Sequence, residues 1–431
     1  MKASLRVVIL SWEFPPRIVG GIAPHVYNLS CDLVSKGVDV HVVTCDFPGA
    51  EKSEEINGVH VLRVDSSKIS SPNFATWVYL MNMHMQSEAA DLINHLSGDV
   101  DVIHAHDWLV ANAAIGLKHI FRVPLVATIH STEMGRRNGL RTDYERMVHQ
   151  TEKWLSHEAW RVICCSKYMA SHVRSTFVLP EERVVVIPNG VDINDFPKEP
   201  DKTQFRRSFA SDDEKIVLFV GRLVYEKGVQ VLINAVPKVL AKVNAKFVIV
   251  GDGYLKDSLA GQVNRMGLNH KVYFTGFIDD QTLRKLYGCA DVCVVPSLYE
   301  PFGITALEAM AAKVPLVVAD SGGLSEIVGH DRTGVRVFPN NADSLAWGIT
   351  RVLLNPVYAT WIRTNAYNEV LDKYNWMKAG EKVKILYQWI RSEHQDGSWK
   401  PIRKAEKYVP LNRKSNLIIR PEVEKTPSLM D

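Results

Sequence analysis

The fold is indicated by the stretch Ser-Leu-Tyr-Glu-Pro-Phe-Gly-Ile-Thr-Ala-Leu-Glu-Ala-Met at residues 297–310, where a buried strand gives way to a helix. The apolar run 292–295 before it is typical of a short strand, and Gly303 frees the backbone ahead of a helix-forming run. Open α/β sheets bind ligands at such strand ends. The amides of a helix N-terminus attract phosphate, and the carboxylates of Glu300 and Glu308 accept hydrogen bonds from hydroxyls. The stretch therefore predicts a sugar-nucleotide site.

Composition limits the classes of protein that this chain can belong to. Its 431 residues, 46% hydrophobic and 23% charged, are enough for two large domains with ample cores. The 51 basic and 48 acidic side chains give a formal charge of +3, which does not favour nucleic-acid binding. No apolar stretch approaches the roughly 20 residues of a membrane span, and the N-terminus lacks a signal-peptide pattern. We expect a cytoplasmic protein, whose oligomeric state the sequence does not decide.

The cysteines do not follow a metal-binding or disulfide pattern. They form neither a CxxC pair nor a Cys/His cluster with zinc spacing. Most of them lie in apolar runs, and they are Cys31, Cys45, Cys164, Cys165, Cys289 and Cys293. We expect buried thiols in a reducing compartment.

Short β-branched runs alternate with longer helical stretches in two sets. Strands are expected in the first set at 7–10, 40–44, 59–64, 102–105, 125–129, 162–165 and 184–187, and in the second at 216–220, 247–250, 272–274, 292–295 and 316–318. Strands buried on both faces and separated by helices imply parallel sheets. The fold class is therefore α/β, with two doubly wound, Rossmann-like domains at 1–195 and 196–372.

The stretch at 297–310 resembles the E-x7-E signature of retaining glycosyltransferases with the two-Rossmann-domain (GT-B) architecture, the glycogen and starch synthase-like superfamily. Within this group the chain looks closest to glycosyltransferase family 4. The resemblance covers about the first 390 residues and implies that Glu300 faces the donor sugar and Glu308 the ribose. It also implies that Phe302, Gly303 and Ile304 line the donor site.

Further elements match the same family. Gly221 to Gly228 resembles the GR-x-x-x-x-KG element, in which Arg222 and Lys227 neutralise the donor diphosphate. We expect no metal, because the aspartate pairs 212–213 and 279–280 lie in linker or turn contexts unlike a DxD site.

The rest of the donor pocket is expected at three loops. Gly251 ends one strand, and the backbone of Phe277 and Ile278 follows another and contacts the base in the family. Main-chain contacts discriminate poorly between bases, so these residues do not choose between uracil, adenine and guanine. The family resemblance implies UDP-glucose or ADP-glucose as the co-substrate. Gly20 and Gly21 follow the first strand, where paired glycines permit positive φ and let backbone amides approach a phosphate.

The first domain is expected to supply polar groups to the reaction centre. His130 ends the strand 125–129 and matches the family histidine that binds the sugar hydroxymethyl group, while Asn189 matches a residue that reaches the donor sugar. His104 and His106 are expected to point to opposite faces of their strand and so not to share a metal ion. Asp107 is expected near the acceptor.

The acceptor is the least determined part of the reaction. A glycine-punctuated loop after His130 carries Arg136, Arg137 and Arg141, which we expect to bind the acceptor. An α-glucan is favoured, as in glycogen synthase, and a lipid or a phosphorylated small molecule stays open. The aromatic stretch 74–79 also keeps peripheral membrane contact open. A sugar-nucleotide epimerase is the rival enzyme, and a carbohydrate-binding scaffold the non-enzymatic one.

The C-terminal part divides in two. The apolar pattern of 373–395 predicts a helix that, in the family, crosses back to the first domain. The charged, proline-containing segment 396–431 is expected to be a mobile or docking tail.

Overall fold

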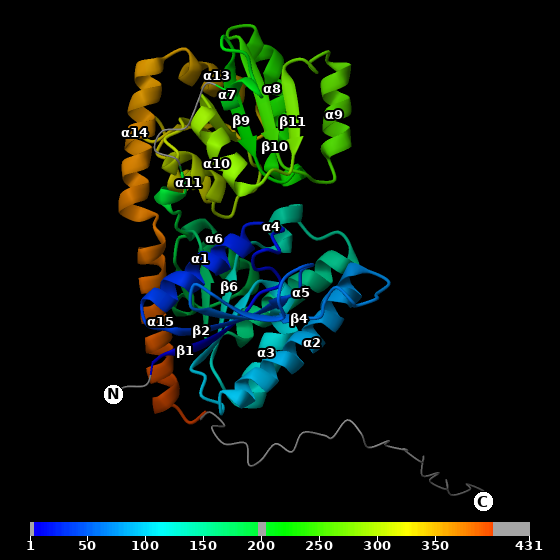
Figure 1. Cartoon of the computed structure of the whole chain (residues 1–431), viewed down its shortest axis with the longest axis vertical. Helices are drawn as coiled ribbons and strands as arrows, with labels where there is room; N and C mark the ends of the chain where they lie inside the picture. The colour runs from blue at the N-terminus through cyan, green and yellow to red at the C-terminus, as the bar shows by residue number, and fades with distance from the viewer. Residues whose placement is uncertain (1–3, 197–203, 400–431) are drawn as a thin grey trace, which may run out of the picture.

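The computed structural model describes residues 4–196 and 204–399, and these form two α/β domains joined by a long helical segment (Figure 1). The predicted fold class, with two parallel-sheet domains and a C-terminal helix that returns to the first, is confirmed. The tail prediction falls outside the described residues except at 396–399, where Trp399 packs on the ring of Trp160.

Within the described residues the first domain holds an eight-stranded sheet in the order β3-β4-β2-β1-β5-β6-β7-β8. The strands are β1 Arg6–Leu10, β2 Asp39–Cys45, β3 Ser53–Ile56, β4 Val59–Val64, β5 Val102–His106, β6 Leu125–Ile129, β7 Arg161–Cys164 and β8 Val184–Val186. All pairs are parallel except β3–β4, a hairpin whose turn uses Asn57 and Gly58, both with positive φ. The sequence did not predict β3, because Ser53-Glu54-Glu55-Ile56 is too polar to be recognised as a strand.

The second domain holds a parallel sheet of six strands within the described part of the chain, in the order β11-β10-β9-β12-β13-β14. They are β9 Lys215–Val220, β10 Ala245–Val250, β11 Val272–Gly276, β12 Val292–Val295, β13 Leu316–Ala319 and β14 Val335–Val337. Five of these were predicted, and β14 was missed because it is three residues long.

Helices cover both faces of each sheet. In the first domain they are α1 Ile22–Ser35, α2 Phe74–His95, α3 Ala111–Phe121, α4 Glu133–Arg137, α5 Asp143–Glu158 and α6 Lys167–Phe177. The second domain has α7 Gln204–Arg207, α8 Val229–Leu240, α9 Lys256–Arg265, α10 Asp280–Cys289, α11 Ile304–Ala311, α12 Leu324–Ile327, α13 Ala342–Leu353 and α14 Pro356–Lys373, followed by α15 Trp376–Asp396. Short 3₁₀ turns lie at Trp108–Val110, Glu181–Arg183, Ile193–Asp195 and Tyr225–Lys227.

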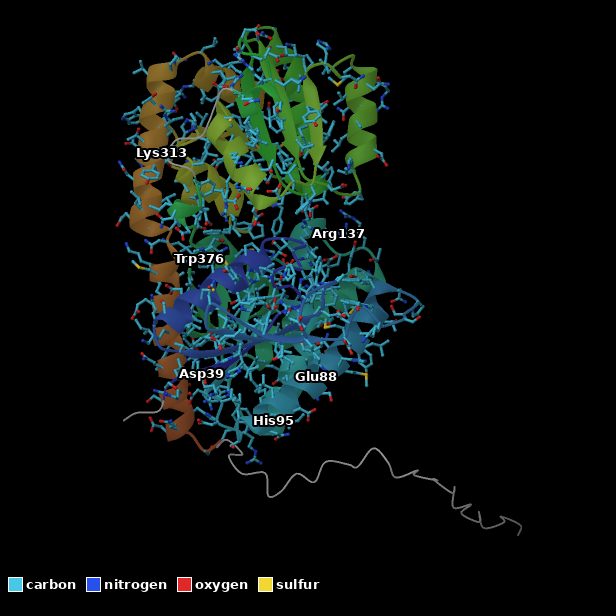
Figure 2. The ribbon with its side chains drawn as sticks, viewed as in Figure 1. Asp39, Glu88, His95, Arg137, Lys313 and Trp376 are labelled. Atoms are coloured by element: carbon cyan, nitrogen blue, oxygen red, sulfur yellow. The ribbon has the colours of Figure 1, made fainter. Side chains whose placement is uncertain are left out.

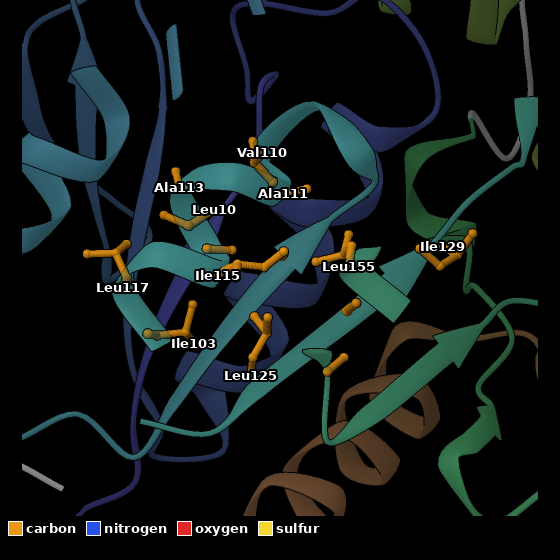
Figure 3. Close-up of a cluster of buried hydrophobic side chains, with 14 of the residues drawn as sticks. Leu10, Ile103, Val110, Ala111, Ala113, Ile115, Leu117, Leu125, Ile129 and Leu155 are labelled. Carbon is orange, nitrogen blue, oxygen red and sulfur yellow. The ribbon is translucent and has the colours of Figure 1, made fainter. Parts of the chain in front are cut away.

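Each sheet separates two hydrophobic layers. In β1, Val8 and Leu10 belong to one cluster and Val7 and Ile9 to another, because successive side chains point to opposite faces. Figure 3 shows the first of these clusters, in which strand residues such as Leu10 and Leu125 meet helix residues such as Ile115. Burial on both faces explains why the strands have continuous apolar sequences.

The chain returns to the first domain at the junction of α14 and α15, near Trp376 in Figure 2. The side chain of Asn375 caps α15, which then lies along α1. Gly190 packs so closely here that an added Cβ would lie 2.3 Å from the Trp376 nitrogen. The amide of Val191 donates to the carbonyl of Tyr374 at 3.0 Å, so this junction ties the two domains together.

Two further expectations concern the whole chain. All six cysteines are unpaired thiols, of which Cys31 is partly exposed and the other five are buried, as expected. A search of the described helices finds none with the length and apolarity to cross a membrane.

Candidate active site

The signature stretch forms the predicted strand-to-helix turn. After β12 the chain runs through Glu300 to Gly303. Gly303 has a φ of 116° and is the residue immediately before α11. An added Cβ on Gly303 would lie 2.6 Å from a Leu324 methyl carbon, so both conformation and space require glycine. The Glu300 carbonyl accepts from the Gly323 amide at 2.8 Å, which anchors the turn to the loop after β13.

Glu300 and Lys227 are in direct contact. The Lys227 Nζ donates to the Glu300 Oε2 at 2.7 Å, and the Ser297 hydroxyl donates to the same oxygen at 3.0 Å. Gly228 lets the two loops approach, since an added Cβ there would lie 2.0 Å from the Pro296 carbonyl oxygen. The structure thus brings together a cation and a carboxylate that are 73 residues apart in sequence.

Arg222 lies at the other end of the same loop. Its side chain is half exposed, and its nearest acid is Glu226 at 3.6 Å. The loop crosses the end of β10 so tightly that an added Cβ on Gly251 would lie 2.0 Å from the Gly221 carbonyl oxygen. Arg222 is therefore held on a well-packed loop with its guanidinium accessible to an anion.

The remaining donor-site residues of this domain differ in exposure. Glu308 on α11 accepts from the Tyr287 hydroxyl at 2.8 Å, and burial raises the pKa of its carboxyl to about 7. After β11, Phe277 is 73% exposed, whereas Ile278 and Phe302 pack into the core of the second domain.

The glycine pair of the first domain is organised by a residue that the sequence reasoning missed. The Glu13 carboxylate accepts from the amides of Val19 at 2.5 Å and Gly20 at 3.0 Å, and burial raises the pKa of Glu13. The expected use of positive φ is wrong, because Gly21 has a φ of −74° as the residue before α1. Gly21 is instead favoured by the limited space around it. An added Cβ on Gly21 would lie 3.1 Å from the Ile304 side chain of the second domain.

His130 belongs to a cluster of histidines. Its Nε2 lies 3.0 Å from the His106 Nδ1, and the His25 ring lies 4.6 Å from the His130 ring. The His25 Nδ1 pairs with the Asn189 Oδ1 at 2.9 Å, which brings two predicted site residues, His130 and Asn189, to one place. Burial lowers the pKa of His130 to about 3 and those of His25 and His106 as well, so these imidazoles are neutral at pH 7.

The expectation that His104 and His106 point to opposite faces is wrong. Residues two apart on a strand share a face, and these two rings lie 4.3 Å from each other. His104 is hydrogen bonded on both sides, to the Tyr387 hydroxyl at 2.5 Å and the Thr128 hydroxyl at 2.7 Å. His25, His106 and His130 each offer a nitrogen within 4.8 Å of the other two, so this cluster is able to hold a metal ion. The absence of a metal from the reaction stays a prediction.

Asp107 supports the loop that starts at His130. It is 4% exposed, and its Oδ1 accepts from the His130 amide at 2.7 Å. Burial raises the pKa of Asp107 to about 6. Its backbone has a φ of 61°, which is unusual for a residue other than glycine and directs the chain into the turn after β5. The contact is a positioning one, and the predicted role toward the acceptor stays a prediction.

The three loop arginines are not equivalent. Arg136 pairs with the buried Glu133 at 2.7 Å and lies 3.6 Å from the buried Glu152, whose pKa is raised to about 8 by burial. The side chain of Arg137 is half exposed, and Figure 2 shows it at the face of the first domain turned toward the second. Arg141 donates to the Arg137 carbonyl at 2.9 Å.

Residues of the two domains meet around this loop. The Thr132 amide donates to the hydroxyl of Tyr299, the neighbour of Glu300, at 3.4 Å. The Ser166 hydroxyl donates to the Pro301 carbonyl at 2.6 Å, and the Glu326 carboxylate accepts from the Tyr168 amide at 2.6 Å. The signature turn thus faces the His130 loop directly.

Comparison with known proteins identifies the family. A model described as Glycosyltransferase Family 4 matches residues 19–195, and one described as Glycosyl transferases group 1 matches residues 201–369. An uncharacterized glycosyltransferase of Methanocaldococcus jannaschii is 44% identical over 389 residues, which are 89% of this chain and 98% of that protein. A glycogen synthase of Mycobacterium tuberculosis is 34% identical over 398 residues, covering 89% of this chain and 94% of the synthase.

Solved structures share the fold. Sucrose-phosphate synthase from Thermosynechococcus elongatus has a TM-score of 0.78 at 24% identity, covering 90% of this chain and 100% of that one. The catalytic domain of starch synthase IV from Arabidopsis thaliana, bound to ADP and acarbose, has a TM-score of 0.73 at 17% identity with the same coverage. At these identities the likeness concerns architecture alone. With the two family models and the 44% identical relative, it shows that the chain belongs to glycosyltransferase family 4 and has the GT-B fold.

Proposed function

We propose that the enzyme transfers a hexosyl group, most simply glucosyl, from a nucleoside diphosphate sugar to a hydroxyl of an α-glucan, with retention at the anomeric carbon. The observation that carries the proposal is the contact of Lys227 with Glu300. It lies next to the place where Tyr299 meets the loop that follows His130, whose imidazole is neutral. This contact supports the proposal because it joins a cation suited to a phosphate and a carboxylate suited to a sugar hydroxyl, near the boundary of the two domains.

In this proposal the donor lies along the turn 300–308. Arg222, Lys227 and the amides at the start of α11 bind the diphosphate, because they supply positive charge without a divalent ion. Glu308 accepts hydrogen bonds from the ribose, and the base lies by the main chain at 277–278. His130, Asn189 and Glu300 hold the sugar.

Transfer then follows a front-face path. The bond from the anomeric carbon to the diphosphate oxygen breaks, and its electron pair leaves with the diphosphate. The acceptor oxygen bonds to the anomeric carbon on that same face, and its proton passes to the leaving diphosphate oxygen. Arg222 and Lys227 stabilise the charge that grows on the diphosphate, so catalysis consists mainly of positioning and preorganised electrostatics.

The choice of an α-glucan rests on the 34% identical glycogen synthase relative. UDP-glucose or ADP-glucose is the donor in this proposal. Arg137, half exposed although it pairs with Glu133 at 3.2 Å, favours a second candidate, transfer to an acceptor that carries a phosphate or a carboxylate. A cytoplasmic location is also proposed, in keeping with six unpaired thiols.

A panel of nucleotide sugars, each with and without maltoheptaose, tests the proposal. We expect glucan elongation from UDP-glucose or ADP-glucose, and an α-linked product by NMR. A Glu300→Ala variant controls for contaminating activity. A β-linked product would overturn retention, and epimerisation without an acceptor would overturn transfer. Elongation of phosphorylated acceptors in place of maltoheptaose would favour the second candidate.

A further inference from the structure

A cluster of aromatic side chains lies beside the glycine loop and has no role in the steps above. The Phe74 ring stacks on Trp77 with centroids 5.7 Å apart and planes 12° apart, and meets Trp12 edge to face at 6.5 Å. The Arg17 guanidinium lies over both indoles, 5.4 Å from the Trp12 centroid and 5.9 Å from that of Trp77. These four residues are called the aromatic platform below.

The platform is held rigidly and leaves one ring accessible. The Trp77 indole donates to the Ser66 carbonyl at 3.2 Å, and both indoles pack on a buried cluster that contains Trp108. Phe74, by contrast, is 46% exposed although its ring is stacked on Trp77. A ring that is held in place in this way offers its exposed part to a ligand at little entropic cost.

The platform is continuous with the candidate active site along two routes. Trp12 precedes Glu13, whose carboxylate holds the Val19 and Gly20 amides, and Gly21 reaches Ile304 of the second domain. Trp108 beneath the platform follows Asp107, which holds the His130 amide. The platform therefore lies beside the two first-domain loops that approach the signature turn of the second domain.

We propose that the aromatic platform is a binding subsite for the acceptor glucan, with Phe74 stacking on a glucose unit next to the one that receives the new sugar. A glucose ring has an apolar C–H face that packs on an aromatic ring and equatorial hydroxyls that point outward. Arg17, whose guanidinium lies over both indoles, supplies donors for such hydroxyls. This inference rests on the proposed glucan acceptor and names where that acceptor binds.

The geometry favours a sugar over a membrane surface. Tyr79 and Met83 are also exposed on α2, at 57% and 54%. At about 100° per residue they lie roughly 140° and 180° around the helix from Phe74. Tyr79 and Met83 therefore share one side of α2 and Phe74 lies on another, so the three do not form one continuous face. A membrane-binding helix needs such a face. The exposed part of the Phe74 ring, beside the glycine loop, suits a small apolar ligand surface instead.

The test compares Phe74→Ala with a matched control, Tyr79→Ala, which removes an exposed aromatic ring from the same helix but outside the platform. Binding of maltoheptaose to the full-length protein is measured by tryptophan fluorescence without donor. Transfer kinetics then give separate KM values for donor and acceptor. We expect Phe74→Ala to raise the glucan Kd and the acceptor KM about tenfold with the donor KM unchanged, Phe74→Trp to restore both, and Tyr79→Ala to resemble the wild type.

The outcomes separate this proposal from the proposed function. Glucan transfer with the same acceptor KM in Phe74→Ala would overturn the platform and leave the function intact. Phe74-dependent glucan binding by a protein that transfers to other acceptors would overturn the glucan synthase function and leave the platform as a glucan site. Phe74-dependent sedimentation with vesicles of phosphatidylcholine and phosphatidylserine, without glucan binding, would overturn the platform in favour of a membrane contact.

Discussion

Lys227 and Glu300 form an ion pair of 2.7 Å between two strand-end loops, with the Ser297 hydroxyl on the same carboxylate oxygen. The side chains are 23% and 10% exposed, so the pair is partly shielded from water and is held by the close packing of Gly228. In the proposed reaction the donor phosphate binds Lys227 in place of Glu300, and a hydroxyl of the donor sugar binds Glu300 in place of Lys227. The ion pair therefore keeps both groups oriented until the donor replaces it.

The first prediction concerns the two cations. Lys227→Ala and Arg222→Ala should each lower kcat by about two orders of magnitude, since each removes charge stabilisation worth on the order of 3 kcal/mol at the leaving diphosphate. Circular dichroism should show an unchanged fold. Lys238→Ala, which breaks the surface pair with Asp343, is the matched control and should keep full activity. Near-normal turnover in either active-site variant would contradict the assignment.

The second prediction is that transfer survives exhaustive dialysis against EDTA. Two cations and the amide groups at the start of α11 replace a divalent ion in the proposed mechanism. Activity should be measured before and after dialysis, with metal content checked by mass spectrometry. Loss of activity that Mg²⁺ or Mn²⁺ restores would show that the reaction needs a metal. Such a result would direct attention to the cluster of His25, His106 and His130.

The sequence predicted the groups whose function depends on local spacing. Glu300, Lys227 and Glu308 were predicted because each belongs to a short motif at a strand end. The structure brings Lys227 into contact with Glu300, and the roles of all three toward the donor stay predictions. Glu13, His25 and Tyr299 were missed, because their importance comes from tertiary contacts. His25 meets Asn189 across 164 positions and Thr132 meets Tyr299 across 167, and no local pattern encodes such pairs. A signal for Glu13 did exist: an acidic residue near a glycine pair is suited to hold free amides.

The third prediction uses the pKa of Glu308, which burial raises to about 7. Ribose hydroxyls donate to the ionised carboxylate, so nucleotide binding should favour loss of its proton. Affinity for a nucleoside diphosphate should therefore rise as pH increases through about 7 and level off above it. Titration calorimetry in buffers of different ionisation enthalpy would measure the proton released. The phosphate itself titrates near pH 6, so Glu308→Gln is the control, and its binding should lose the step near 7.

The fourth prediction tests the junction that joins the domains. Gly190→Ala should lower stability by roughly 2 kcal/mol, because the new Cβ would lie 2.3 Å from the Trp376 nitrogen and backbone must move. The melting temperature is the measurement. Gly261→Ala in α9 is the control: its Cβ would meet the flexible end of Arg265 at 3.4 Å, and alanine favours a helix by roughly 1 kcal/mol. Equal melting temperatures for Gly190→Ala and the wild type would show that the backbone at the junction moves to accommodate the new Cβ at no cost in stability.

The last prediction separates the loop arginines. Arg137→Gln combined with Arg141→Gln should raise the acceptor KM far more than the donor KM, because both side chains are exposed on the loop that meets the signature turn of the second domain. Arg136→Gln should act on stability instead, since it removes the guanidinium beside two buried acids, Glu133 and Glu152, which are 5% and 1% exposed. Arg137 still pairs with Glu133 in that variant, so Glu152 is the acid that loses its cation. Breaking a buried pair costs on the order of 3 kcal/mol.

The pH dependence of stability distinguishes the two roles. Glu152 ionises in the folded protein near pH 8, far above its unfolded value, and Arg136 lowers that pKa against the effect of burial. Without Arg136 the folded pKa rises further, so the loss of melting temperature in Arg136→Gln should grow as pH increases through about 8. The Arg137 and Arg141 double variant should show no such trend. If that variant leaves the acceptor KM unchanged, the loop is a solvated surface, and the acceptor is bound elsewhere.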